Sequence, residues 1–172
     1  MRPWIVWATG LLAYIVAVLD RTTLGVSGLA AADRFGAGPS LLSTFVVLQV
    51  VVYAGAQVPA GLLLDRYGSR ALIASGAALM ASGQLGLAFT ESLPAAIAAR
   101  AVVGLGDAVT FISVLRLVPH WFAPRQIPVV TQLTGICGQL GQVLSAIPFL
   151  ALLSASGWSV AYASAAALDG RR

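Results

Sequence analysis

Charged residues are scarce in this sequence. Only 9% of its 172 residues are Asp, Glu, Lys or Arg, 59% are hydrophobic, and all ten basic residues are arginine. A soluble domain carries about 25% charged residues, because its surface must face water. The scarcity therefore excludes an ordinary soluble fold and indicates an integral membrane protein with no separate soluble domain.

Cysteine and histidine occur once each, at Cys137 and His120. A disulfide needs two cysteines and a metal site needs several ligands, so cysteine builds neither a disulfide framework nor a metal cluster within this chain. The sequence also lacks a serine nucleophile elbow and a G-x-x-x-x-G-K phosphate loop. We therefore expect no enzyme activity, no metal and no cofactor.

Long apolar runs separated by short polar turns fill the chain. About 20 apolar residues cross a bilayer as a helix, which predicts an all-helical, single transmembrane domain over residues 1–172. The expected spans cover about 4–29, 41–64, 71–89, 95–118 and 129–153, with a partial span at about 158–168. Prolines between Pro119 and Pro128 predict an interfacial loop after the fourth span. The short last span leaves two possibilities, a fragment of a longer reading frame or an abnormal final span.

The arginines predict how the chain crosses the membrane. One side of the expected spans holds most of the arginines in or near loops: Arg2, Arg66, Arg70, Arg116 and Arg125. The loops of the other side hold Arg34 alone. Because cytoplasmic loops are enriched in Lys and Arg, we expect a multi-pass protein of the cytoplasmic (plasma) membrane with its amino terminus in the cytoplasm. The net charge of +4 thus reflects topology rather than a nucleic-acid surface.

The loop after the second span reads GLLLDRYGSR from Gly61 to Arg70. It resembles the G-x-x-x-D-R-x-G-x-R signature of the major facilitator superfamily, and RAVVGLG from Arg100 to Gly106 is similar to that family's R-x-x-x-G-x-G motif. The resemblance implies the amino-terminal six-helix bundle of a twelve-helix transporter.

In relatives, the signature loop is a conformational latch. The resemblance assigns that role to Gly61, Asp65, Arg66, Gly68 and Arg70, and the first of these glycines is expected to let a partner helix approach. Asp65 lies at the carboxyl end of a helix, where a negative charge needs positive partners. Arg66 and Arg70 are the expected partners.

Polar side chains inside the spans are candidates for a solute pathway. DRTTLGV, from Asp20, resembles the D-R-x-x-L-x-V stretch of organic-anion and phosphate-ester transporters in the superfamily, which implies that Arg21 binds an anion. Gln49 and Tyr53 lie on one helical stripe with Gln57. Arg100 and Asp107, seven residues apart, share a face of the fourth span, which suits a cavity group coupled to proton movement and a protonatable carboxylate.

Charge is expensive in lipid, at about 2.5–3.5 kcal/mol for a residue at the centre of a span. We therefore expect Arg21, Gln49, Tyr53, Arg100 and Asp107 to line a substrate and ion pathway. Two alternatives remain open. Arg100 and Asp107 could form a static structural pair, and Asp20 with Arg21 could be interfacial if the first span ends before them.

The resemblance implies secondary active transport of a small solute by alternating access. An ion gradient drives such transport, and we favour proton symport, with an organic anion as the candidate solute. Because a cavity of this kind forms between two halves, the chain is expected to need a missing carboxy-terminal half or a second copy. Two other interpretations stay open: a half-transporter that dimerises, and a non-transporting membrane protein such as an interaction partner or a degenerate gene product.

Overall fold

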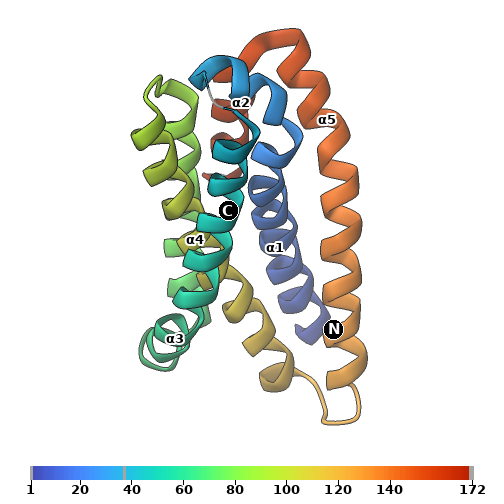
Figure 1. Ribbon diagram of the computed structural model, residues 1–172. Coiled ribbons are helices and arrows are strands. Elements are labelled where there is room, and N and C mark those ends of the chain that lie inside the picture. The colour runs from blue at the N-terminus through green and yellow to red at the C-terminus, as the bar shows by residue number, and fades with distance from the viewer. Residues whose placement is uncertain (1, 37, 171–172) are drawn as a thin grey trace.

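A computed structural model describes residues 2–36 and 38–170, and every regular element in that part of the chain is a helix (Figure 1). In chain order the helices are α1 (Arg2–Val26), α2 (Gly28–Phe35), α3 (Pro39–Phe89), α4 (Leu93–Trp121) and α5 (Ile127–Asp169). Among the described residues, four helices, all except α2, are long and apolar enough to cross a membrane. The chain is therefore a multi-pass helical membrane protein.

The two longest helices, α3 and α5, each reverse direction at one glycine. Gly68 has φ 78° and ψ 164°, and Gly157 has φ 79° and ψ 178°, a backbone conformation that glycine adopts without steric cost. Figure 1 shows α3 and α5 each running to one end of the molecule and back. Helical geometry resumes directly after each glycine, so α3 and α5 each contain two of the predicted spans. The predicted count of five spans and a partial sixth is therefore not confirmed.

Two predicted boundaries differ from the ends of the helices. The first span was expected to reach residue 29, but α1 ends at Val26 and the separate helix α2 follows Ser27. The predicted loop over 119–128 is present but shorter than expected, because α4 continues through Pro119 to Trp121 and α5 begins at Ile127, which leaves residues 122–126 as the connection. Pro128 lies in the first turn of α5, where its missing N–H would have no helical partner.

Glycines bring α3 and α4 into backbone contact. A Cβ added to Gly83 would lie 2.8 Å from the Ala99 carbonyl oxygen, and one added to Gly106 would lie 2.7 Å from the Gly76 carbonyl oxygen. Small residues permit such approach between membrane helices, where packing replaces hydrophobic drive. This contact fixes the position of α4 along its axis, and with it the level at which the polar residues of α4 face α1 and the first half of α3.

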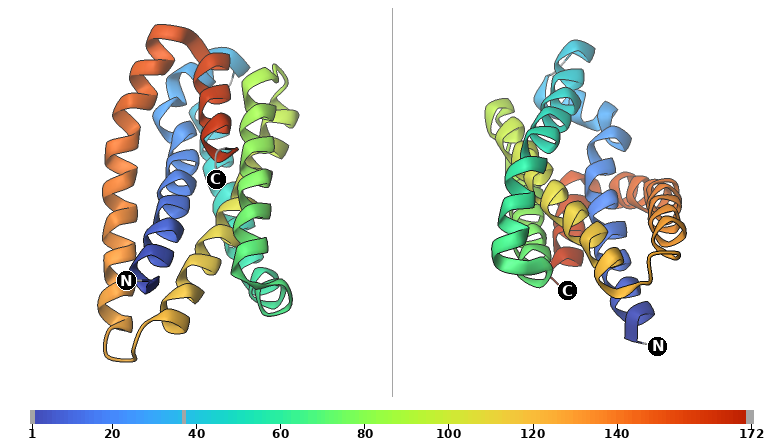
Figure 2. Two further views of the ribbon diagram at one scale, coloured as in Figure 1. Left: turned by 180° about the vertical axis from the view of Figure 1, so that it is seen from behind. Right: turned by 90° about the horizontal axis from the view of Figure 1, so that it is seen from below.

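The second segment of α5 closes one end of the bundle. The Trp158 indole nitrogen donates to the Leu87 carbonyl oxygen at 2.7 Å, and the Ser27 and Tyr162 hydroxyls lie 2.7 Å apart. Figure 2 shows this segment descending beside α3, with the carboxyl end of the chain at mid-height. Large apolar side chains cover the outer surface, such as Val47 at 59% exposed and Val58 at 75% exposed, as expected of a surface that faces lipid.

Candidate functional site

A polar cavity of about 470 Å³ lies between α1, α3, α4 and α5. All five residues predicted to form the pathway line it: Arg21, Gln49, Tyr53, Arg100 and Asp107. They come from three helices and are separated by up to 86 residues in the sequence. The fold therefore brings Arg21 of α1 together with Arg100 and Asp107 of α4 around one space.

Asp20 and Arg21 are neighbours on α1 but face different surroundings. The helix continues to Val26, so both residues lie inside it rather than beyond its end. Asp20 is fully buried, and its carboxylate accepts a hydrogen bond from Gln84 Nε2 at 3.0 Å. Arg21 lines the cavity. Successive residues on a helix point about 100° apart, which is why the acid is enclosed between helices while the base meets the cavity.

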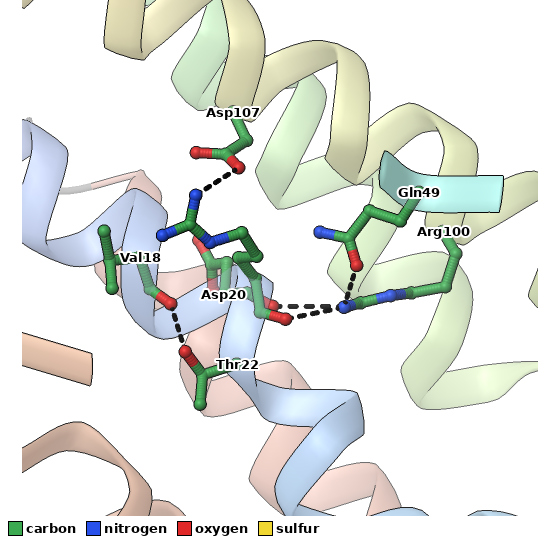
Figure 3. Close-up of polar contacts among 7 residues, drawn as sticks. Val18, Asp20, Thr22, Gln49, Arg100 and Asp107 are labelled. Atoms are coloured by element: carbon green, nitrogen blue, oxygen red, sulfur yellow. Dashed lines mark hydrogen bonds and ion pairs between the residues drawn. The ribbon is translucent and has the colours of Figure 1, made fainter. Parts of the chain in front are cut away.

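Arg21 forms an ion pair with Asp107 across the cavity. Its Nη1 lies 3.5 Å from Asp107 Oδ2, with side-chain exposures of 33% for Arg21 and 0% for Asp107 (Figure 3). The second carboxylate oxygen, Oδ1, has no hydrogen-bond partner among the described residues. A buried carboxylate needs a compensating charge, and here a single contact with a partly accessible guanidinium supplies it.

Arg100 does not pair with Asp107, although the two share a face of α4. Its guanidinium donates to two main-chain carbonyls of α1, at 2.7 Å to Arg21 and 3.1 Å to Asp20, and to Gln49 Oε1 of α3 (Figure 3). In Figure 3 the Arg100 side chain meets the α1 backbone and Gln49, while the Asp107 carboxylate lies apart from it. Arg100 therefore ties α1 to α3 and α4, whereas Asp107 takes its counter-charge from Arg21.

The stripe predicted on α3 faces inward over part of its length. Gln49 and Tyr53 line the cavity, and Gln57 is not among the lining residues. The Tyr53 ring lies 6.2 Å from that of Phe111, so that one side of the tyrosine packs on α4.

Two polar residues of the site, Gln84 and Gln142, lie outside the predicted pathway set. Gln84, on α3, also donates to the Asp20 carbonyl oxygen at 3.2 Å, and to Thr23 Oγ1 at 3.4 Å. It is the one amide in an otherwise small and apolar stretch of sequence from 71 to 89, and that isolation was the available signal. Gln142 of α5 also lines the cavity, whereas Gln139 of the same helix is exposed.

The predicted latch residues lie at the end of the molecule where α3 reverses. The expected partner of Asp65 was wrong: Arg116 of α4 donates to Asp65 Oδ1 at 2.7 Å, because α4 packs alongside α3 there. The Arg66 guanidinium instead lies 5.4 Å from the centre of the Tyr67 ring. A Cβ on Gly61 would meet Ile112 at an ordinary 3.8 Å.

Arg70 faces a second, larger hollow. This groove of about 1150 Å³ is lined mostly by small and apolar residues of α1, α3 and α4. Neither hollow is a candidate metal centre, since no three His, Cys, Asp or Glu residues gather within 2–36 and 38–170.

Comparison with known proteins places the sequence among membrane transporters. The profile of the Major Facilitator Superfamily matches residues 10–168. Methyl viologen resistance protein SmvA of Salmonella typhimurium is 30% identical over 62% of this chain and 22% of its own length. The oxalate:formate antiporter of Oxalobacter formigenes is 26% identical over 71% and 28%, and a putative tartrate transporter of Agrobacterium vitis is 26% identical over 86% and 34%. The chain spans only between 22% and 34% of these relatives.

Proposed function

We propose that this chain, which belongs to the Major Facilitator Superfamily, supplies one half of a carrier that moves a small solute across the cytoplasmic membrane. The observation that carries the proposal is the cavity in which Arg21 and Asp107 meet at membrane depth. Ionisable groups inside membrane proteins mark solute and ion pathways, because only a polar pathway justifies their cost.

The solute we propose is a small organic anion that binds Arg21. A guanidinium offers two parallel N–H donors that match the oxygens of a carboxylate, and it stays charged at every physiological pH. Arg21 is one-third exposed in the cavity and makes one contact, at 3.5 Å, with a carboxylate. Two relatives are named for small carboxylates, oxalate, formate and tartrate, which supports the same class of solute here.

Competition for Arg21 supplies a route to proton coupling. An arriving carboxylate that takes the Arg21 guanidinium displaces Asp107, whose side chain is fully buried. A buried carboxylate without a counter-charge is stable in its neutral form, so that Asp107 would take up a proton as the anion binds. The same state of the carrier then holds both the anion and the proton, as symport by alternating access requires.

The other half of the carrier comes from a carboxy-terminal half or a second copy. A carrier cavity forms between two such halves, and this chain spans between 22% and 34% of the length of these relatives. The amino-terminal end of α1, the bend at Gly68 and the α4–α5 connection lie at one end of the molecule (Figure 1). We place that arginine-rich end in the cytoplasm, with Gly61, Asp65, Arg66, Gly68 and Arg70 forming a latch toward the second half.

Uptake into proteoliposomes tests the proposal. With the chain alone, monomeric after crosslinking analysis, we expect no gradient-driven flux of oxalate, succinate or tartrate. Robust flux by the monomer would refute the need for a second half, and flux by a crosslinked dimer would identify a dimerising half-transporter. Anion binding that Arg21→Gln abolishes supports the assigned site. Binding of methyl viologen, a dication, in place of any anion would contradict it.

A further inference from the structure

Two residues that line the polar cavity each carry a buried hydrogen-bond donor with no partner in the part of the chain that the structure describes. Gln49 Nε2 and Arg100 Nε make no hydrogen bond to any described residue, although both residues line the cavity. Gln49 is 5% exposed and Arg100 is 1% exposed. Because leaving a buried donor unpaired is unfavourable, a bound group that accepts hydrogen bonds would be stabilised here.

The orientation of the Gln49 amide is set by its surroundings. Its Oε1 accepts a hydrogen bond from Arg100 Nη2, so that turning the amide over would place two donors against each other. Figure 3 shows the Gln49 side-chain nitrogen directed away from Arg100. The amide thus directs its N–H groups away from Arg100, on a residue that lines the cavity.

The position of Gln49 is set by Gly104 of α4. A Cβ at Gly104 would lie 3.1 Å from the Gln49 carbonyl oxygen and 3.3 Å from Gln49 Cγ. Only a residue without a side chain lets this turn of α3 rest against α4 without displacement. The donor is therefore held on a rigid helix contact, as a selective binding group must be.

We propose that Gln49 determines specificity by reading a second polar group of the solute. This inference rests on the proposed function, in which Arg21 holds the carboxylate of an anion. Gln49 Nε2 then donates to a hydroxyl or second carboxylate elsewhere on the same molecule. The cavity prefers small hydroxy acids and dicarboxylates to monocarboxylates with an apolar end, because the latter leave the Gln49 donor unpaired.

Butyrate and its 2-hydroxy, 3-hydroxy and 4-hydroxy derivatives test this preference. The four acids carry one charge each, and the derivatives differ only in the position of one hydroxyl. Binding to the purified 172-residue chain in lipid nanodiscs is measured by calorimetry. We expect at least one hydroxy acid to bind about tenfold more tightly than butyrate, the factor that one net hydrogen bond supplies.

Gln49→Met removes the donors without adding charge and should reduce that ratio to about one. Gln139→Met, on an exposed part of α5, is the matched control and should keep the ratio. If Gln49→Met does not fold, Gln49→Glu is measured instead, since it keeps an oxygen that accepts from Arg100 but has no side-chain N–H. The added negative charge affects the binding of all four acids equally, because each carries one charge, so the ratio of their affinities still reports the lost N–H.

Each outcome separates this inference from the function on which it rests. Equal binding of all four acids by the wild type, or a preference that survives both Gln49 substitutions, overturns the role of Gln49 and leaves anion binding intact. No binding of any of these acids, or binding unchanged in Arg21→Gln, overturns the anion site itself and the inference with it.

Discussion

The ion pairs Arg21–Asp107 and Arg116–Asp65 join the same two chemical groups in opposite surroundings. The pair at the end of the molecule is the closer, at 2.7 Å, with both side chains about 60% exposed. The pair in the cavity is 3.5 Å apart and its carboxylate is fully buried. Water solvates and screens the exposed pair, so that it contributes little, whereas the buried carboxylate depends on its partner. Burial, not distance, decides which pair matters.

The largest difference between the pairs should follow loss of the cavity guanidinium. Arg21→Gln leaves Asp107 buried without a counter-charge, and we expect the free energy of unfolding to fall by about 2 kcal/mol. The measurement is a denaturant titration in detergent micelles. Arg125→Gln, an exposed arginine in the α4–α5 connection, is the control and should leave stability unchanged. If Arg21→Gln lowers the free energy of unfolding no more than Arg116→Gln does, burial does not distinguish the two ion pairs.

Removing the other member of the buried pair should cost less. Asp107→Asn leaves a guanidinium that is one-third exposed and can be hydrated from the cavity, so we expect a loss of about 1 kcal/mol. Because Asn no longer competes for Arg21, anion binding should tighten severalfold in calorimetry. Weaker anion binding in Asp107→Asn would contradict the competition. The double variant Arg21→Gln/Asp107→Asn should recover part of the stability that Arg21→Gln loses.

Two glycines on the helices that carry these pairs should respond with opposite sign. A Cβ at Gly104 meets backbone of the Gln49 turn at 3.1 Å, whereas at Gly61, one turn from Asp65, the nearest atom is 3.8 Å away. Gly104→Ala should therefore lower the free energy of unfolding by about 1 kcal/mol. Gly61→Ala should be neutral or raise it by up to about 1 kcal/mol, because alanine favours the helix. Equal effects in the same titration would show that the cavity residues do not depend on close helix approach.

The smallest effect belongs to the exposed pair. Asp65→Asn should change the free energy of unfolding of this chain by less than about 0.5 kcal/mol. Repeating the titration at 1 M salt should remove even that difference, since the Debye length falls to about 3 Å. A larger effect that salt does not change would mean that Asp65 is buried against a further copy or partner.

Much of the polar cavity was predictable because lipid leaves so few positions for charge. Arg21, Arg100 and Asp107 stand out in apolar runs, and the four-residue spacing of Gln49 and Tyr53 placed them on one stripe. Their partners were not predictable from spacing. Asp65 pairs with Arg116, 51 residues away, instead of with Arg66 or Arg70, and Arg100 binds main-chain carbonyls of α1 that carry no signal in the sequence.

That the chain is helical, spans a membrane and belongs to a transporter family can be inferred from its residues alone, because hydrocarbon forces long apolar helices and leaves turn and motif residues conspicuous. Which charges meet depends instead on how the helices pack. Arg21 faces Asp107 while Asp20, one residue earlier, is enclosed beside Gln84. That choice depends on how glycine contacts set the depth and rotation of α1, α3 and α4 against one another, a property of packed surfaces rather than of any local stretch of residues.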